Sequence, residues 1–387
     1  MINTKESQEI NKMNEVKELT ASSPPVNTKP LRSSGIDIVK IFAAIMVVTV
    51  HFYLNTAFYA VIPITDSNFI PPIMLLWTAY TCVPLFMITT GYLMKNKTLT
   101  KGYYKGIVKI VVFYLAVSTI CLIYKIKHGA ELTPWEILRG YLRFSHCDYA
   151  WYVEQYFVMF LCIPFLNLAF SGLKSKKQHI ALLVTVIVLF SVAPSFYLGF
   201  DPADQIKPLP EFPTRVYPVA YYYLGCYIRQ YPPKKNLSTK LAAFGIFAAA
   251  LAFLTYSLYT QSKNNENQYF RSYHFFEYYS YPVFAAAGGI FVLLHDIRFR
   301  SKILVKVLSI ISQTSLLTYL MSRIFDMKYY DPFNYKYEYP DFLLRFRHIY
   351  EIVPKVYFLS LMWSLVILAV YSGIAKIINH FLKPKET

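Results

Sequence analysis

Ten long apolar runs constrain the fold of this chain more than any other feature. Nine of them are 17 to 25 residues long and the last is 31. At ~1.5 Å per residue, a helix of about 20 residues crosses a hydrocarbon core of ~30 Å. The runs cover residues 36–58, 70–94, 104–124, 150–171, 179–200, 213–229, 240–260, 275–295, 303–325 and 352–382. We therefore predict an all-α fold, a polytopic transmembrane helical bundle of about ten spans in a lipid bilayer.

The composition agrees with this fold. Hydrophobic residues make up 55% of the chain and charged residues only 16%, against roughly a quarter charged in soluble domains. The net charge of +17 is a feature of some nucleic-acid-binding proteins, but basic residues gathered in one set of membrane loops give the same balance. We expect no nucleic-acid partner.

The distribution of cations between the spans predicts the orientation. Every second connection carries a compact basic cluster, which resists translocation across the membrane. These clusters are Lys95, Lys97, Lys101 and Lys105; Lys174, Lys176 and Lys177; Arg229, Lys234, Lys235 and Lys240; and Arg298, Arg300 and Lys302. We predict that these loops and both termini are cytoplasmic, although the connection 125–149, on the opposite side, also holds four cations.

A division into three parts follows from the spans. Residues 1–34 are polar, contain the Pro24–Pro25 step and predict a disordered cytoplasmic tail. Residues 35–382 form the membrane domain, and 383–387 form a short cytoplasmic tail. The five cysteines and eight histidines are scattered without metal-binding spacing, so no metal site is expected.

Ionisable residues within the apolar runs are the first candidates for function, because they are costly in a membrane. Lys40 and His51 stand eleven residues apart in the first run, which places them on one helical face roughly 16 Å apart along the axis. His51 suits a general base, and Glu154, near the start of the fourth run, suits the carboxylate that supports it. In the alternative interpretation, Lys40 extends to the interface, His51 is a hydrogen-bonded structural histidine and Glu154 faces water.

A polar cluster precedes the fourth run, in the connection predicted to face outwards. Arg143, His146 and Asp148 lie there, and Trp151 begins the run itself. We predict that these four residues bind a sugar acceptor. A solvated loop without a ligand is the alternative.

Several segments resemble acyltransferase family 3, the bacterial integral-membrane O-acyltransferases. Asp37 to His51 is similar to the Asp-x-x-Arg-x10-His opening of that family, and Pro84–Leu93 to its Phe-Phe-x-Ile-Ser-Gly-Tyr-Leu element. Further similar segments are Tyr104–Ile110, at the place of a basic Arg-x-x-Arg pair, Trp151–Pro164, Tyr223–Gly225 and Ser315–Leu320. The resemblance covers about residues 35 to 380.

This resemblance implies an O-acyltransferase of the bacterial cytoplasmic membrane. It implies that acetyl-CoA or another acyl-CoA enters from the cytoplasm as donor substrate, with no permanently bound cofactor. The acceptor would be a hydroxyl of a surface glycan or lipid-linked saccharide. His51 takes the catalytic position, and Lys40, Lys105 and Lys109 take positions that would hold the CoA phosphates.

Three departures from the family pattern accompany the resemblance. Lys40 replaces the usual Arg, Gly106 replaces the first Arg of the basic pair, and Ser322 stands where many members have His. Two other functions stay open. A transporter or exporter of a glycan or its precursor would also suit ten helices with tyrosine-rich spans and buried ionisable groups. The departures at Gly106 and Ser322 favour a membrane sensor or scaffold without activity. The spacing of Lys40 and His51 beside a basic element favours the acyltransferase, because a transporter has no need of it.

Overall fold

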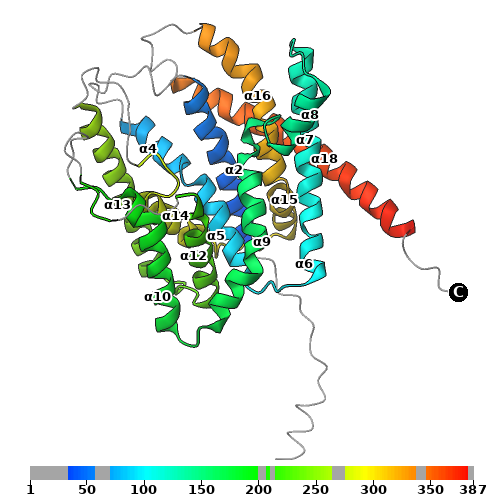
Figure 1. Ribbon diagram of the computed structural model, residues 1–387. Helices are drawn as coiled ribbons and strands as arrows, with labels where there is room; N and C mark the ends of the chain where they lie inside the picture. The colour runs from blue at the N-terminus through cyan, green and yellow to red at the C-terminus, as the bar shows by residue number, and fades with distance from the viewer. Residues whose placement is uncertain are drawn as a thin grey trace, which may run out of the picture. The chain divides into compact units, whose positions relative to one another are not determined.

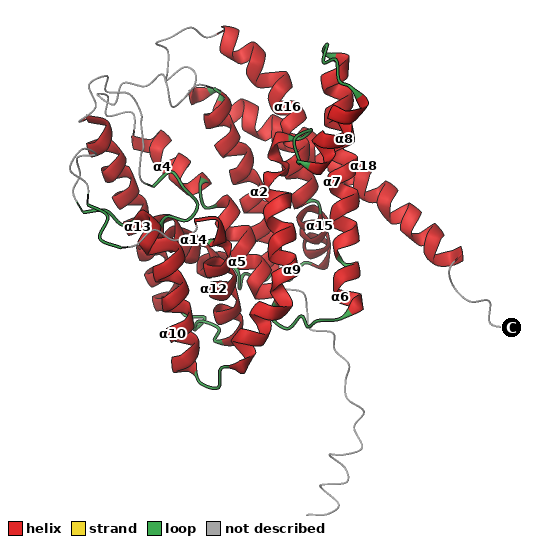
Figure 2. Ribbon diagram, viewed as in Figure 1, coloured by secondary structure: helices red, strands yellow, loops and turns green. Residues whose placement is uncertain are grey.

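The computed structural model describes residues 34–56, 70–198, 206–209, 214–263, 275–336 and 346–381, and every structural statement below concerns these residues. They belong to one compact unit, Ser34–Thr387. As predicted, they form helices and no strand (Figure 2), with a single isolated bridge between Leu198 and Ile206. The predicted tails lie outside the described residues, except that Ser34 opens the first helix.

The order of the helices along the chain is shown in Figure 1. They are α2 (Ser34–Asn55), α4 (Ile70–Ala79), α5 (Cys82–Met94), α6 (Lys101–Lys105), α7 (Ile107–Lys127), α8 (Pro134–Leu142), η2 (Asp148–Ala150), α9 (Trp151–Gly172), α10 (Lys176–Ile187), the π-helix η3 (Val188–Val192), α11 (Ala193–Ser195), η4 (Thr214–Val216), α12 (Pro218–Gln230), α13 (Leu237–Lys263), α14 (Tyr281–Leu294), α15 (Lys302–Gln313), α16 (Ser315–Lys336) and α18 (Ile349–Phe381).

The helices long and apolar enough to cross a membrane number seven in the described residues, or eight if the bent pair α15–α16 is one span. The chain is therefore a multi-pass membrane protein. Two of the ten predicted segments, 213–229 and 275–295, differ because their helices are short: α12 has 13 residues and α14 has 14. At ~1.5 Å per residue neither reaches across a core of ~30 Å, so apolar runs overestimated the helix length there.

Helix α2 runs through the middle of the helical unit. It packs against α4, α5, α14, α15, α16 and α18. In the most apolar 18-residue segment of α2, 67% of the residues are buried, against 11% in that of α18. The remaining surface of a helix such as α18 is apolar and suits lipid. Since α2 carries Asp37, Lys40 and His51, the ionisable residues of the first span are on a helix that packs within the bundle.

Helices α5 and α12 cross with their backbones in close contact. A Cβ atom on Gly91 would lie 1.9 Å from the carbonyl oxygen of Tyr222, and one on Gly225 would lie 2.1 Å from that of Ile88. The Cys226 thiol donates a hydrogen bond to the Gly91 carbonyl, with 3.5 Å between sulfur and oxygen. Because lipid provides no hydrophobic force between helices, close packing of small residues holds such crossings together.

The helix formed by α15 and α16 breaks at Thr314 with a bend of 59°. The Thr314 hydroxyl donates a hydrogen bond to the Ile311 carbonyl, 2.7 Å away. Beside the break, Ser312 donates a hydrogen bond to the Asp37 carboxylate on α2. The break is therefore fixed against the start of α2, close to Lys40.

Gly91→Ala tests the α5–α12 crossing. We expect it to lower the free energy of unfolding by at least about 2 kcal/mol, because the added methyl group meets backbone that cannot move aside as a side chain would. Thermal melting in detergent measures the loss. Gly245→Ala on α13 is the matched control, since a Cβ there has no neighbour within 4 Å. Equal melting of the two variants would show that the crossing is not tightly packed.

Candidate active site

His51 is buried near the C-terminal end of α2. Its imidazole stacks on the ring of Tyr149, with 3.7 Å between ring centroids and 22° between planes. The ring of Tyr319 lies at 6.0 Å in a tilted arrangement. These two tyrosines come from η2 and α16, so three distant parts of the chain meet at His51.

A carboxylate lies beside the imidazole, and it belongs to Asp326 on α16. Asp326 Oδ2 is 3.6 Å from His51 Nδ1, and the side chain of Asp326 is completely buried. The Tyr149 hydroxyl donates a 2.5 Å hydrogen bond to the same carboxylate oxygen. A buried carboxylate within a membrane helix is costly, and its pairing with an imidazole is the arrangement that orients a catalytic base.

Two polar atoms of this pair have no hydrogen-bond partner among the described residues. They are Nδ1 of His51 and Oδ1 of Asp326, both fully buried. Buried polar atoms nearly always have a partner, so these two atoms are candidates for a hydrogen bond with each other's side chain or with a substrate group. A shortening of the 3.6 Å separation by a few tenths of an ångström would make the pair a direct hydrogen bond.

Charged residues form a rim next to Tyr149. Arg323 Nη2 lies 2.7 Å from Asp148 Oδ2, and Lys125 Nζ lies 3.6 Å from Asp148 Oδ1. The Arg323 guanidinium also lies over the Tyr149 ring, 5.6 Å from its centroid. The predicted acceptor-binding residue Asp148 is thus half-exposed and holds two cations close to the His51 site.

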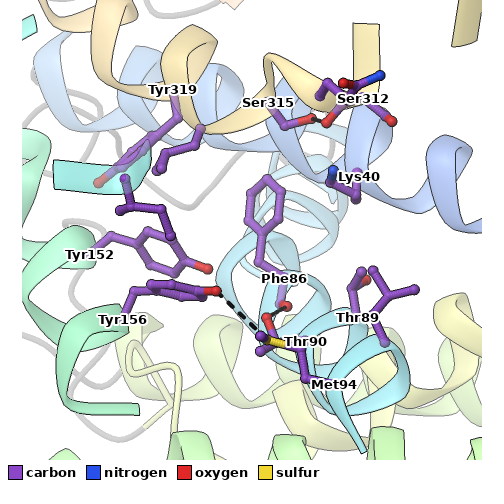
Figure 3. Close-up of a pocket in the computed structure, with 14 residues that line it drawn as sticks. Lys40, Phe86, Thr89, Thr90, Met94, Tyr152, Tyr156, Ser312, Ser315 and Tyr319 are labelled. Carbon is purple, nitrogen blue, oxygen red and sulfur yellow. Dashed lines mark hydrogen bonds between the residues drawn. The ribbon is translucent and has the colours of Figure 1, made fainter. Parts of the chain in front are cut away.

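A cavity of about 230 Å³ lies between α2, α5, α9 and α16 (Figure 3). Its lining is mainly apolar, with Lys40 on one side and Tyr152, Tyr156 and Tyr319 on the other. The Thr89 hydroxyl is buried in this lining and has no hydrogen-bond partner among the described residues. Since Tyr319 also contacts His51, the cavity runs from Lys40 towards the His51 site.

The other predicted donor-binding lysines lie outside this lining. Lys105 is exposed at the end of α6, and the Lys109 ammonium lies over the rings of Phe113 and Tyr371, at 5.3 and 6.0 Å. Of the three lysines, only Lys40 lines the cavity. A contact of Lys105 or Lys109 with a donor stays a prediction.

The remaining predicted site residues are Glu154, His146, Arg143 and Trp151, and they differ in exposure and in contacts. Glu154 is exposed on α9, and the carboxylate found beside His51 is that of Asp326. His146 is buried under α8, where its Nε2 bonds the Ile137 carbonyl at 2.7 Å. Arg143 is exposed, and Trp151 stacks on Tyr278 with 5.9 Å between centroids. Roles for these four residues in the reaction stay predictions.

The structure adds Tyr149, Tyr319 and Asp326, which the sequence analysis did not select. Asp326 follows the predicted end of the ninth span, at residue 325, by one position. In the structure α16 continues to Lys336, so Asp326 is inside a helix. Tyr319 and Asp326 are seven residues apart, about two helical turns, which was the available signal that they share a face. No comparable signal marks Tyr149.

Metal ligands do not gather in the described part of the chain. No group of three or more His, Cys, Asp or Glu side chains is placed there to hold an ion, and the five cysteines are free thiols. The chemistry available at the site is that of an imidazole with a carboxylate, hydroxyl groups and one cavity lysine. Such groups can remove a proton from a hydroxyl and hold an anionic donor.

Comparisons with known proteins support an assignment to a family. Searches of curated proteins and of solved structures found no match. The family model described as an acyltransferase domain matches residues 33–374, nearly the whole chain, and this confirms the resemblance of the sequence motifs. The chain therefore belongs to acyltransferase family 3, and it is a membrane acyltransferase.

Proposed function

We propose that the protein transfers an acetyl group from cytoplasmic acetyl-CoA to a hydroxyl of an extracytoplasmic or lipid-linked glycan, in the bacterial cell membrane. The observation that carries this proposal is the cavity between Lys40 and Tyr319, because the Tyr319 ring that lines it also contacts His51. A donor held at the Lys40 end would place its acyl group near the imidazole. An acceptor hydroxyl would reach the same imidazole from the side of Arg323 and Asp148.

The cavity suits the thioester arm of an acyl-CoA. Its lining is mostly apolar, while Lys40 offers a cation for a phosphate at one end. The unpartnered Thr89 hydroxyl offers a hydrogen bond to an amide of the arm. The family usually has Arg at the position of Lys40, so here the phosphate would meet a point charge rather than a planar guanidinium.

The chemical step uses His51 as general base. Its imidazole takes the proton from the acceptor hydroxyl while the hydroxyl oxygen attacks the thioester carbon. The new C–O ester bond forms, the C–S bond breaks, and the CoA thiolate leaves and takes up a proton. The Asp326 carboxylate, 3.6 Å from Nδ1, would hold the ring orientation and stabilise the imidazolium that forms.

The proposed acceptor side is formed by the connection before α9 together with Arg323 of α16. Asp148 of this connection pairs with Arg323, and Arg143 and Trp151, close to Asp148 in the sequence, are exposed. Such charged and aromatic groups suit a sugar. His146 would act indirectly, through its bond to α8.

His51→Gln tests the catalytic base. We expect acyl transfer to fall by at least ~10²-fold while thermal melting stays near wild type, because the amide keeps hydrogen bonding but cannot take up a proton. Mass spectrometry of surface polysaccharide, from cells that express each variant in place of the native gene, measures the product. His128→Gln, at the exposed end of α7, is the control. Near-full acylation by His51→Gln would refute the assignment, and a failure to fold would indicate a structural histidine.

Asp326→Asn and Glu154→Gln together test which carboxylate supports His51. We expect Asp326→Asn to lower kcat by about 10-fold or more with a small change in KM for the donor, since it acts through the imidazole. Glu154→Gln should have the smaller effect because Glu154 is exposed. Initial rates with acetyl-CoA as the varied substrate provide both constants. A larger loss for Glu154→Gln would return the supporting role to that residue.

Lys40→Met tests the donor site. We expect the KM for acetyl-CoA to rise by about 10-fold, because Met keeps most of the stem volume and removes the charge. Lys40→Arg should keep the KM near wild type, which separates charge from shape. Lys174→Met, in an exposed connection, is the control. An unchanged KM in Lys40→Met would move the phosphate site to other cations, with Lys105 and Lys109 as the next to test.

A further inference from the structure

Tyr319 lies both in the lining of the cavity and against His51. In Figure 3 its ring borders the cavity on the side opposite Lys40, and its hydroxyl points away from the cavity. An acyl group that enters past Lys40 therefore meets the Tyr319 ring before it meets the imidazole.

The Tyr319 ring is held firmly in this position. Its hydroxyl donates a 2.5 Å hydrogen bond to the Tyr149 carbonyl, and its ring stacks on Tyr149 with 5.9 Å between centroids. The Tyr152 ring meets it edge-on at 5.8 Å. Tyr319 is 4% exposed, so these contacts leave little freedom for the side chain to turn aside.

The fixed Tyr319 ring limits the length of the acyl group that a donor can carry. Reaction requires the thioester carbon to come within about 3 to 3.5 Å of the attacking oxygen at His51. The acyl group is the leading end of a donor held at Lys40, so it lies against the Tyr319 and Tyr152 rings that line the cavity. A longer acyl chain needs volume that these rings occupy, and close-packed rings cannot supply it without strain.

We propose that Tyr319 determines acyl-group specificity by forming the wall that admits an acetyl group and excludes longer acyl chains. This inference rests on the proposed transfer from acyl-CoA. It assigns to Tyr319 a role in selecting the donor, distinct from the proton transfer by His51. A purely structural role for Tyr319 would change stability or the overall rate without changing the choice between donors.

The test compares acetyl-CoA with butyryl-CoA as donors for purified protein in detergent. The acceptor is surface polysaccharide from the source cells, de-O-acylated with mild alkali, and transfer is followed by CoA thiol release and mass spectrometry of the ester. For wild type we expect kcat/KM to favour acetyl-CoA by at least ~100-fold, since even one excess methylene group in a tight pocket discriminates by about 10- to 200-fold. In Tyr319→Leu this preference should fall by at least ~10-fold, mainly through faster use of butyryl-CoA.

Two further variants complete the test. Tyr319→Phe keeps the ring and should keep the preference for acetyl-CoA, while Tyr319→Met, with a flexible unbranched side chain, should lower it as Leu does and serves if the Leu variant does not fold. Tyr221→Leu is the matched control, because Tyr221 is a buried tyrosine outside the cavity lining whose hydroxyl also donates to a backbone carbonyl, that of Tyr278 at 2.6 Å. Its donor preference should equal that of wild type.

Two results would overturn the inference, and they are distinguishable. If wild type transfers acetyl groups but the folded Leu or Met variant keeps the wild-type donor preference, Tyr319 does not select the acyl group and the proposed function stands. If wild type transfers no acyl group from either donor, the proposed function itself fails, and the inference with it.

Discussion

The backbone contact between α5 and α12 supports the rest of the site. Gly91 and Gly225 allow the two helices to meet carbonyl against Cα, and a side chain at either position would separate them. Phe86, Thr89 and Thr90, on the same α5, then line the cavity. Two motif segments that lie far apart in the sequence therefore converge on one crossing, which explains physically why both contain glycine.

The fold class was predictable from the sequence because the cost of an unpaired backbone in lipid permits few alternatives to helices. Helix length was less predictable. The runs 213–229 and 275–295 are mainly apolar, but α12 and α14 begin at Pro218 and just before Pro282, and both are largely buried. Positions buried against protein and positions exposed to lipid are both occupied by apolar residues. Hydropathy therefore cannot distinguish a short internal helix from a complete span.

The candidate site was predictable only in part, for a related reason. His51 and Lys40 were found because each is an ionisable residue inside an apolar run, which is a local signal. The partner of His51 depends on which helix packs against α2, and that is a tertiary property. Glu154 satisfied this local criterion and Asp326, one residue beyond its run, did not, yet α16 and not α9 brings a carboxylate within 3.6 Å of the imidazole.

Tyrosine has a distinct structural role in this bundle, because its hydroxyl can satisfy a carbonyl that regular helix leaves unpaired. Pro164 inside α9 has no N–H to offer the Phe160 carbonyl four residues earlier, and the Tyr103 hydroxyl donates to that carbonyl at 2.5 Å. The Tyr319 hydroxyl likewise donates to a backbone carbonyl, that of Tyr149 in the short helix η2. Lipid offers no water for such groups, so irregular backbone near His51 persists only where a side chain supplies the missing hydrogen bond. The hydroxyl that fixes Tyr319 thus also fixes Tyr149, whose ring stacks on the proposed base.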